Sequence, residues 1–256
     1  MEVSTDLPST MAQMLAPFVS SDEALIRIAV SEASKAIEPA ARAKLIAPLL
    51  TDELRAVRVA AADALADAPV DAALSAAFNR AFAELIKANE LSSWRGEGRA
   101  NQGLLHMRRG ELDKAEQQYI TAISIDPYFS ASYINLTDIY RATMQPQKAQ
   151  QFYELAVRNL PKDATIRYSY GLHLIRQGKT KEAAEQFELS VRYQPDDEQN
   201  LYVWLLTLDS LKQWDKGLQL LLQRQQSRPL SARLQQLGMD MAQKAGNREA
   251  YQRLKY

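Results

Sequence analysis

The sequence predicts an all-α fold, an α-solenoid in which helical hairpins stack into a right-handed superhelix. A repeat of 34 residues runs through the C-terminal two thirds of the chain, and a repeat of 31 residues fills the N-terminal quarter. Apolar residues at helical spacing lie between the two repeats. Because each hairpin of such an array buries its apolar face only against its neighbours, we expect an extended surface that can bind a partner.

The N-terminal repeat aligns two segments without a gap. Residues 15–19 (LAPFV) match residues 46–50 (IAPLL), and residues 25–29 (LIRIA) match residues 56–60 (AVRVA). The pattern predicts two short units, each with a helix, a turn and a second helix. Because two units are too few for a free-standing solenoid, we expect them to pack against the segment that follows.

Each N-terminal unit has an acidic turn, at Asp22 or Asp52, before a helix that opens with a hydrophobic residue and an arginine, Arg27 or Arg58. We expect each arginine to hydrogen-bond a carboxylate or carbonyl group of a turn and so to tie adjacent turns together. An arginine that is simply exposed at a repeated surface position is the alternative.

Residues 70–91 form an alanine-rich segment with helical spacing of apolar residues. The long repeat has a small, a large and a second small residue at fixed positions in the second helix of its hairpin. Shifted back by 34 residues, these positions fall on Ala81, Leu85 and Ala88. We expect this helix to dock as half a repeat under the first hairpin. A flexible linker is the alternative, since residues 91–99 contain two serines and two glycines.

The composition changes near residue 94. All nine glycines lie at or after Gly96, and all eleven tyrosines lie at or after Tyr119. We therefore expect N-terminal repeats at 1–68, a connecting helix at 69–94, four long repeats at 95–231 and capping helices at 232–256.

The long repeat carries small and large residues at fixed offsets before a proline. A helix needs a small residue where a neighbour crosses closely, and a large one where the gap between layers must be filled. The repeated positions are Pro127, Pro161, Pro195 and Pro229 for the proline; Ala115, Ala149, Ala183 and Gly217 for the small residue; Tyr119, Tyr153, Phe187 and Leu221 for the large residue; and Ala122, Ala156 and Ser190 for a second small residue.

These offsets resemble the tetratricopeptide repeat family. Gly103, Gly171 and Tyr140 stand where that family places glycine and tyrosine in the first helix of its hairpin, helix A. Gly110 and Gly178 stand at the tight turn before the second helix, helix B, where a positive φ is needed. The four units that fit the pattern are 96–128, 130–162, 164–196 and 198–230.

Two of these units depart from the family pattern. The second unit has Met144, Gln145 and Pro146 at its turn, and the fourth has Lys212 where the family favours glycine. We expect the helices of the fourth unit, and we leave the form of its turn open. After it, a fifth helix A and a final helix B are expected to close the stack.

The resemblance implies that helix A side chains line a concave groove. Some arrays of the family use asparagines at the positions of Asn101 and Asn135 to hold an extended peptide, and an amide suits this role because it both donates and accepts. Ser169 and Val203 follow in the same register, which weakens the case for a long extended ligand. A solvated face without a ligand is the alternative. The expected groove residues are Asn101, Asn135, Asp138, Tyr168, Tyr202, Arg108, Arg141 and Arg176.

Other members of the family clamp a terminal carboxylate with lysines. The key lysine position holds Ala100, Ile134, Tyr168 and Tyr202 in this chain, so we do not expect that mode of binding.

The order of the modules carries a second resemblance. The N-terminal units look like HEAT repeats, and their combination with the alanine-rich helix and tetratricopeptide units is similar to the C-terminal half of bacterial multihaem c-type cytochromes. Those proteins carry Cys-x-x-Cys-His haem sites upstream, and this chain has no cysteine. The resemblance implies a haem-free part of a periplasmic electron-transfer protein that docks a redox protein; a module that stands alone is the other possibility.

Composition excludes several classes of function. The chain has 31 basic and 31 acidic side chains, which argues against nucleic-acid binding. It has no run of about 18 apolar residues that would insert in a membrane, and its first residues lack the pattern of a signal peptide. The absence of cysteine excludes disulfides, thiolate metal sites and covalent haem within this segment, so we expect no cofactor.

Catalytic motifs are also missing. Gly96 and Gly98 form a Gly-x-Gly without a preceding strand, and no Gly-x-Ser-x-Gly nucleophile motif occurs. Of the two histidines, His106 is expected to be a packed, hydrogen-bonded core residue, and His173 lies one position off the equivalent register. The sequence therefore predicts a non-enzymatic protein that binds a protein or peptide.

The register of the long repeat can be tested at Ala149. We expect Ala149→Leu to overpack a helix crossing and to lower the free energy of unfolding by about 1–3 kcal/mol. Urea denaturation measures this change. An unchanged unfolding midpoint would mean that the register is wrong.

Overall fold

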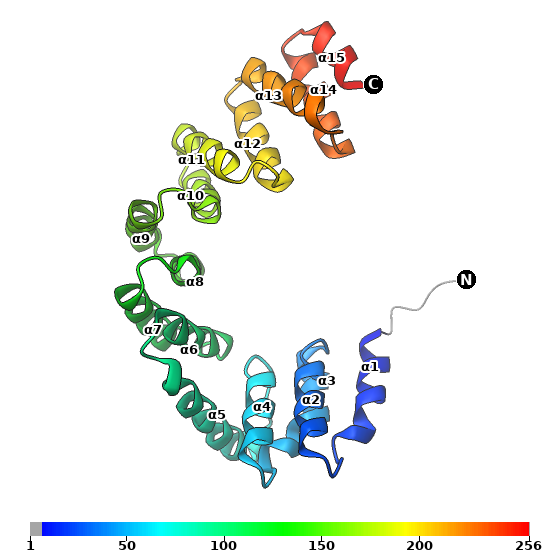
Figure 1. The fold of residues 1–256 in the computed structure, drawn as a ribbon, viewed down its shortest axis with the longest axis vertical. Coiled ribbons are helices and arrows are strands. Elements are labelled where there is room, and N and C mark those ends of the chain that lie inside the picture. The colour runs from blue at the N-terminus through cyan, green and yellow to red at the C-terminus, as the bar shows by residue number, and fades with distance from the viewer. Residues whose placement is uncertain (1–6, 256) are drawn as a thin grey trace, which may run out of the picture. The chain divides into compact units, whose positions relative to one another are not determined.

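The computed structural model describes residues 7–255, and every regular element in that range is a helix (Figure 1). The prediction of an all-α fold of stacked helical pairs is therefore confirmed. Contacts within the chain divide it into two compact units, Met1–Leu136 and Thr137–Tyr256, called unit 1 and unit 2 below. The boundary falls within one helix, Ser130–Ala142.

Unit 1 consists of short helices followed by longer ones. Its α-helices are α1 (Leu7–Leu15), α2 (Ala24–Ser34), α3 (Pro39–Ile46), α4 (Arg55–Ala64), α5 (Ser75–Asn89), α6 (Gly96–Arg108), α7 (Leu112–Ile125) and the first half of α8 (Ser130–Ala142). Its 3-10 turns are η1 (Ala16–Phe18), η2 (Ala47–Thr51), η3 (Ala72–Leu74) and η4 (Glu90–Ser92).

Unit 2 continues with helices of 13 or 14 residues and ends with a shorter one of 8 residues. They are the second half of α8, α9 (Pro146–Asn159), α10 (Ala164–Arg176), α11 (Thr180–Tyr193), α12 (Glu198–Ser210), α13 (Trp214–Ser227), α14 (Ala232–Lys244) and α15 (Arg248–Lys255). Helix α15 is the expected final helix B.

The core of unit 1 forms where α4 packs against α2 and α5. Ala61 and Leu65 at the end of α4 are fully buried, and Phe78 of α5 is 1% exposed. Helix α5 also contacts α6, where the ring of Phe82 lies edge-on to His106 with 6.3 Å between the ring centroids. The segment after the N-terminal units thus forms a packed helix.

Two arginines hydrogen-bond the turns of the N-terminal units, as the repeat predicts. Arg27 donates to both carboxylate oxygens of Asp52, at 2.7 and 3.1 Å, and to the carbonyl of Ser21 at 2.6 Å. Arg58 repeats this arrangement with the carboxylate of Glu84, at 2.8 and 3.0 Å, and the carbonyl of Asp52 at 2.7 Å. The expectation of a hydrogen bond to a turn is confirmed for both arginines.

The turns between helices A and B have one conformation whether or not they contain glycine. Gly110, Gly178 and Gly246 have φ values of 72°, 72° and 69°, and Met144 and Lys212 take the same place with φ values of 55° and 57°. A side chain at such a φ costs about 1–2 kcal/mol. The hydrogen bonds that close each turn therefore outweigh the local preference in the second and fourth repeats.

Helices A and B of one repeat approach closely where helix A has no side chain. A β-carbon placed on Gly103 would lie 2.8 Å from the Tyr119 ring, and one on Gly171 would lie 2.5 Å from the Phe187 ring. The expected pattern of small and large residues is confirmed by burial. The buried positions are Ala115, Ala149, Ala183 and Gly217; Ala122, Ala156 and Ser190; and Tyr119, Tyr153, Phe187 and Leu221.

The contact between Gly171 and Phe187 gives a testable prediction. We expect Gly171→Ala to lower the free energy of unfolding by about 1–2 kcal/mol, because overpacking outweighs the gain in helix propensity. In a Phe187→Leu background the smaller side chain leaves room for the new methyl group, so the same substitution should cost little.

Urea denaturation of the wild type, both single variants and the double variant measures this coupling. Equal losses in the two backgrounds would contradict the close approach of the helices.

Candidate partner-binding surfaces

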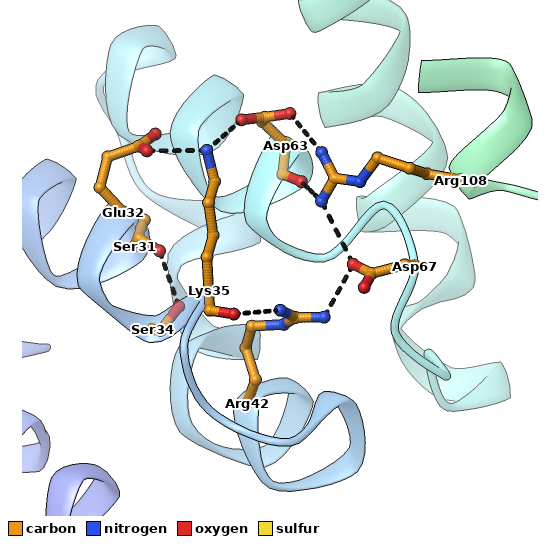
Figure 2. Close-up of polar contacts among 8 residues, drawn as sticks. All are labelled: Ser31, Glu32, Ser34, Lys35, Arg42, Asp63, Asp67 and Arg108. Carbon is orange, nitrogen blue, oxygen red and sulfur yellow. Dashed lines mark hydrogen bonds and ion pairs between the residues drawn. The ribbon is translucent and has the colours of Figure 1, made fainter. Parts of the chain in front are cut away.

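Arg108, an expected groove residue, extends from the end of α6 to the end of α4 (Figure 2). Its guanidinium donates to the carboxylate of Asp63 at 3.0 Å, to the carbonyl oxygen of Asp63 at 2.7 Å and to the carboxylate of Asp67 at 3.2 Å. A cation at the carbonyl end of a helix is favoured by the helix dipole. Arg108 therefore joins the N-terminal helices to the first long repeat.

Further ion pairs extend the contacts of Arg108 to α2 and α3 (Figure 2). Lys35 lies 2.5 Å from the Asp63 carboxylate and 2.7 Å from that of Glu32. Arg42, which is 3% exposed, donates to Asp67 at 2.7 Å and to the carbonyl of Lys35 at 3.2 Å. The cations and carboxylates of this network neutralise one another.

Beside the network is a pocket of about 510 Å³ lined by side chains of α2, α4, α5 and α6, called the unit-1 pocket. Asn101 is exposed in its wall, and its side chain makes no hydrogen bond to another described residue. Leu104, one turn further along α6, is 40% exposed, and Leu105 and Val59 supply more apolar surface. The pocket thus offers a free amide next to apolar side chains.

Asn135 differs from Asn101 although both occupy the same repeat position. It is half-buried on α8, with its side chain near the hydroxyl of Tyr119. Burial raises the pKa of Tyr119 to about 12, and Asn135 opposes that rise. Asn135 is therefore half-buried near a buried hydroxyl of unit 1, whereas Asn101 is exposed to solvent.

In unit 2, the two expected tyrosines belong to a row of contacting side chains from α10, α12 and α14, called the unit-2 tyrosine row. Gln199 donates to the Tyr168 hydroxyl at 3.4 Å, and Arg233 donates to the Gln199 side-chain oxygen at 3.0 Å. The Arg233 guanidinium carbon lies 3.3 Å from the centroid of the Tyr202 ring. The row links three successive A helices through polar and cation–π contacts.

Of the remaining expected groove residues, Asp138, Arg141 and Arg176, only the first two form an ion pair with each other. Asp138 and Arg141 form an exposed ion pair within α8, 3.0 Å apart. Arg176, at the end of α10, is exposed and has no acidic partner among residues 7–255. Arg141 is therefore neutralised locally, and Arg176 is not.

Gln199 and Arg233, on the A-helix side of unit 2, are candidate binding residues that were not predicted from the sequence. They occupy the same position in successive helices, 34 residues apart. The register alone could have found them, but Arg233 belongs to the fifth helix A, which has no regular hairpin pattern after it. Lys35 and Asp63 were missed because they lie in the N-terminal repeat, where the long register does not apply.

Both histidines are core residues. Nδ1 of His106 lies 2.7 Å from the carboxylate of Glu111, which confirms the expected hydrogen-bonded histidine. His173 packs against the stacked rings of Tyr153 and Tyr170, with centroids 5.2 and 6.4 Å away. Burial, followed by the nearby charges of Arg176 and Lys179, lowers the pKa of His173.

The described residues contain no group of three or more potential metal ligands. None of their helices has the length and apolar character needed to cross a bilayer.

Comparison with known proteins identifies one repeat directly. Residues 97–129 match the tetratricopeptide repeat model. This stretch is similar to a tetratricopeptide repeat. This repeat comprises most of α6, all of α7 and the loop before α8, so it contains Asn101 and Arg108. No curated protein sequence matches the chain.

The fold is shared with solved tetratricopeptide repeat proteins. YrrB, described as a TPR protein with an unusual peptide-binding site, is 19% identical over 66% of this chain and 87% of its own, with a TM-score of 0.51. A tetratricopeptide repeat protein from Parabacteroides merdae is 20% identical over 64% of each chain, with a TM-score of 0.51. Yeast Tom70 is 13% identical over 96% of this chain and 53% of its own, with a TM-score of 0.54.

Two carboxyl groups make the stability of unit 1 depend on pH. Partial burial alone would raise the pKa of Asp67, but the hydrogen bonds from Arg42 and Arg108 outweigh it and lower the pKa. The pKa of Asp52 is lowered in the same way, since the hydrogen bonds from Arg27 and the Leu54 amide outweigh burial. Each carboxylate stabilises unit 1 fully above its ordinary pKa of about 4, and this stabilisation is lost as the pH falls through the lower folded value.

We therefore expect the melting temperature to fall between about pH 5 and pH 3, and to fall less in Asp67→Asn, which has no carboxyl group to protonate. Circular dichroism measures the melting curves. Asp113→Asn, at an exposed aspartate of α7, is the matched control and should keep the wild-type slope. A slope in Asp67→Asn as steep as in the wild type would contradict the role of the network.

Proposed function

We propose that the chain is a non-catalytic scaffold that binds a segment of a partner protein on the A-helix side of its repeats. The observation that carries the proposal is the unit-1 pocket, where the free amide of Asn101 stands beside the exposed Leu104. One amide can pair with both polar groups of a peptide bond. An apolar side chain of the partner can be buried against Leu104 at the same time.

The charges of the unit-1 pocket favour an uncharged peptide segment. Lys35, Asp63 and Arg108 line it, and all three are in ion pairs within the network. A charged ligand would have to displace a partner that is already in place, which costs free energy. The zero net charge of the chain also supports a protein partner over a nucleic acid.

Peptide selection tests this proposal. A displayed library of random peptides is selected against the full chain, and the enriched peptides are measured by fluorescence anisotropy. We expect Asn101→Ala to weaken the binding of enriched peptides by about tenfold, the loss of one to two hydrogen bonds.

Gln117→Ala, which removes an exposed amide from α7, is the control and should leave affinity unchanged. The melting temperatures of both variants should stay within about two degrees of the wild type, since the two side chains are exposed. Failure to enrich any peptide, or equal affinity for Asn101→Ala, would contradict binding in the unit-1 pocket.

A second candidate function is that of a haem-free accessory domain in a longer periplasmic cytochrome, where it would dock a redox protein. The hydrogen bonds of Arg27 and Arg58 favour it, because each arginine binds a carbonyl of the turn before its own helix and a carboxylate further along the chain, as the HEAT-like resemblance implies. Haem staining of the native polypeptide tests it. Covalent haem on a polypeptide with a mass well above 28.8 kDa supports this function. A haem-free polypeptide with a mass near 28.8 kDa contradicts it.

A further inference from the structure

Arg233 of the unit-2 tyrosine row is held in place from two sides. The Tyr202 ring lies under its guanidinium at 3.3 Å, and Gln199 accepts a hydrogen bond from Nη1 at 3.0 Å. Arginine on a surface is usually mobile, and a ligand must then restrict its rotamers at a cost in free energy. That cost is reduced here because the side chain is already fixed. Nη2 and Nε of Arg233 have no hydrogen-bond partner among the described residues.

The charge of Arg233 is not neutralised by an ion pair, in contrast to the charges of Lys216 and Lys244 in the same unit. Lys216 pairs with Glu188 at 2.7 Å, and Lys244 pairs with Asp209 at 2.6 Å. No acidic side chain in the described part of the chain pairs with Arg233. Asp240, two turns further along α14, accepts a hydrogen bond from Gln236 instead. Arg233 is thus an ordered guanidinium with an open edge.

An exposed apolar side chain lies on α12 one helical turn from Tyr202, on whose ring the Arg233 guanidinium stacks. Leu206 follows Tyr202 by one helical turn and is 41% exposed, and Tyr202 itself is half-buried. A planar guanidinium stacked on a ring binds carboxylates through two parallel hydrogen bonds. In a bound segment, an apolar side chain next to the carboxylate that pairs with Arg233 would contact Leu206.

We propose that the unit-2 tyrosine row binds a partner segment in which an acidic side chain neighbours an apolar one, with Arg233 as the residue that pairs with the carboxylate. This inference rests on the proposed function, since it names the chemistry of a segment bound on the A-helix side. Charge complementarity decides in favour of an acidic segment, because a basic or neutral one would leave the guanidinium unpaired.

The test uses two synthetic fluorescent octapeptides with blocked ends. One alternates leucine with aspartate, and the other alternates leucine with asparagine, so they differ in charge and hardly in shape. Fluorescence anisotropy gives their affinities for the full chain. We expect the aspartate peptide to bind at least about tenfold more tightly, and to lose affinity as salt is raised because the ion pair is exposed.

Variants of Arg233 separate recognition from a structural role. Arg233→Gln should reduce the preference for the aspartate peptide to about twofold or less. Arg233→Lys should keep part of it, because lysine retains the charge without the planar stacked group. Arg192→Gln, at an exposed arginine of helix α11, removes the same charge from a B helix and should leave the preference unchanged.

Equal affinity for the two peptides, no binding of the aspartate peptide, or an unchanged preference in Arg233→Gln would overturn this inference. The proposed function is judged separately by the enriched peptides and Asn101→Ala. The two results can differ. If the enriched peptides need Asn101 but Arg233→Gln leaves the preference for the aspartate peptide unchanged, the scaffold function stands and the acidic ligand is ruled out.

Discussion

The close approach of helix A to helix B within a repeat is the constraint on which the rest of the structure depends. The rings of Tyr119 and Phe187 occupy the space next to Gly103 and Gly171, where even a methyl group would collide. This contact sets the rotation of helix A about its own axis. Once Gly103 faces helix B, the helical period turns Asn101 and Leu104 towards the other side. The exposed surface of the A helices therefore follows from what is buried behind them.

The two units use their cations differently. In unit 1, Lys35, Arg42 and Arg108 form ion pairs in a network that joins three N-terminal helices to the first long repeat. The charged side chains that line the pocket beside it balance one another. In unit 2, Arg233 is fixed by an aromatic ring and an amide, neither of which cancels its charge. The same repeat architecture thus presents a pocket of balanced charge in one unit and an unpaired guanidinium in the other.

Contacts that recur at a fixed offset could be predicted from the sequence. The partner of a single polar side chain could not, because several groups compete for it. The register identified the buried tyrosines, the turns and the hydrogen bonds of Arg27 and Arg58, because each recurs at a fixed offset. It placed Asn101 and Asn135 as equivalents, yet only Asn101 faces solvent, since a buried tyrosine hydroxyl lies near Asn135. It also assigned Arg108 to a groove and could not foresee that Asp63, in a repeat of different length, would pair with it.

The sequence by itself determined the helices, their pairing and the faces they bury, because these depend on periodic apolar contacts between neighbours in the chain. The tertiary structure alone decided which polar side chains stay available to a partner. Gly110 and Gly178 illustrate the first part, since both have the positive φ that the sequence predicts for the turn between helices A and B. Arg108 and Arg233 illustrate the second: both are cations near an end of an A helix, and only the packing of other helices neutralises one and leaves the other open.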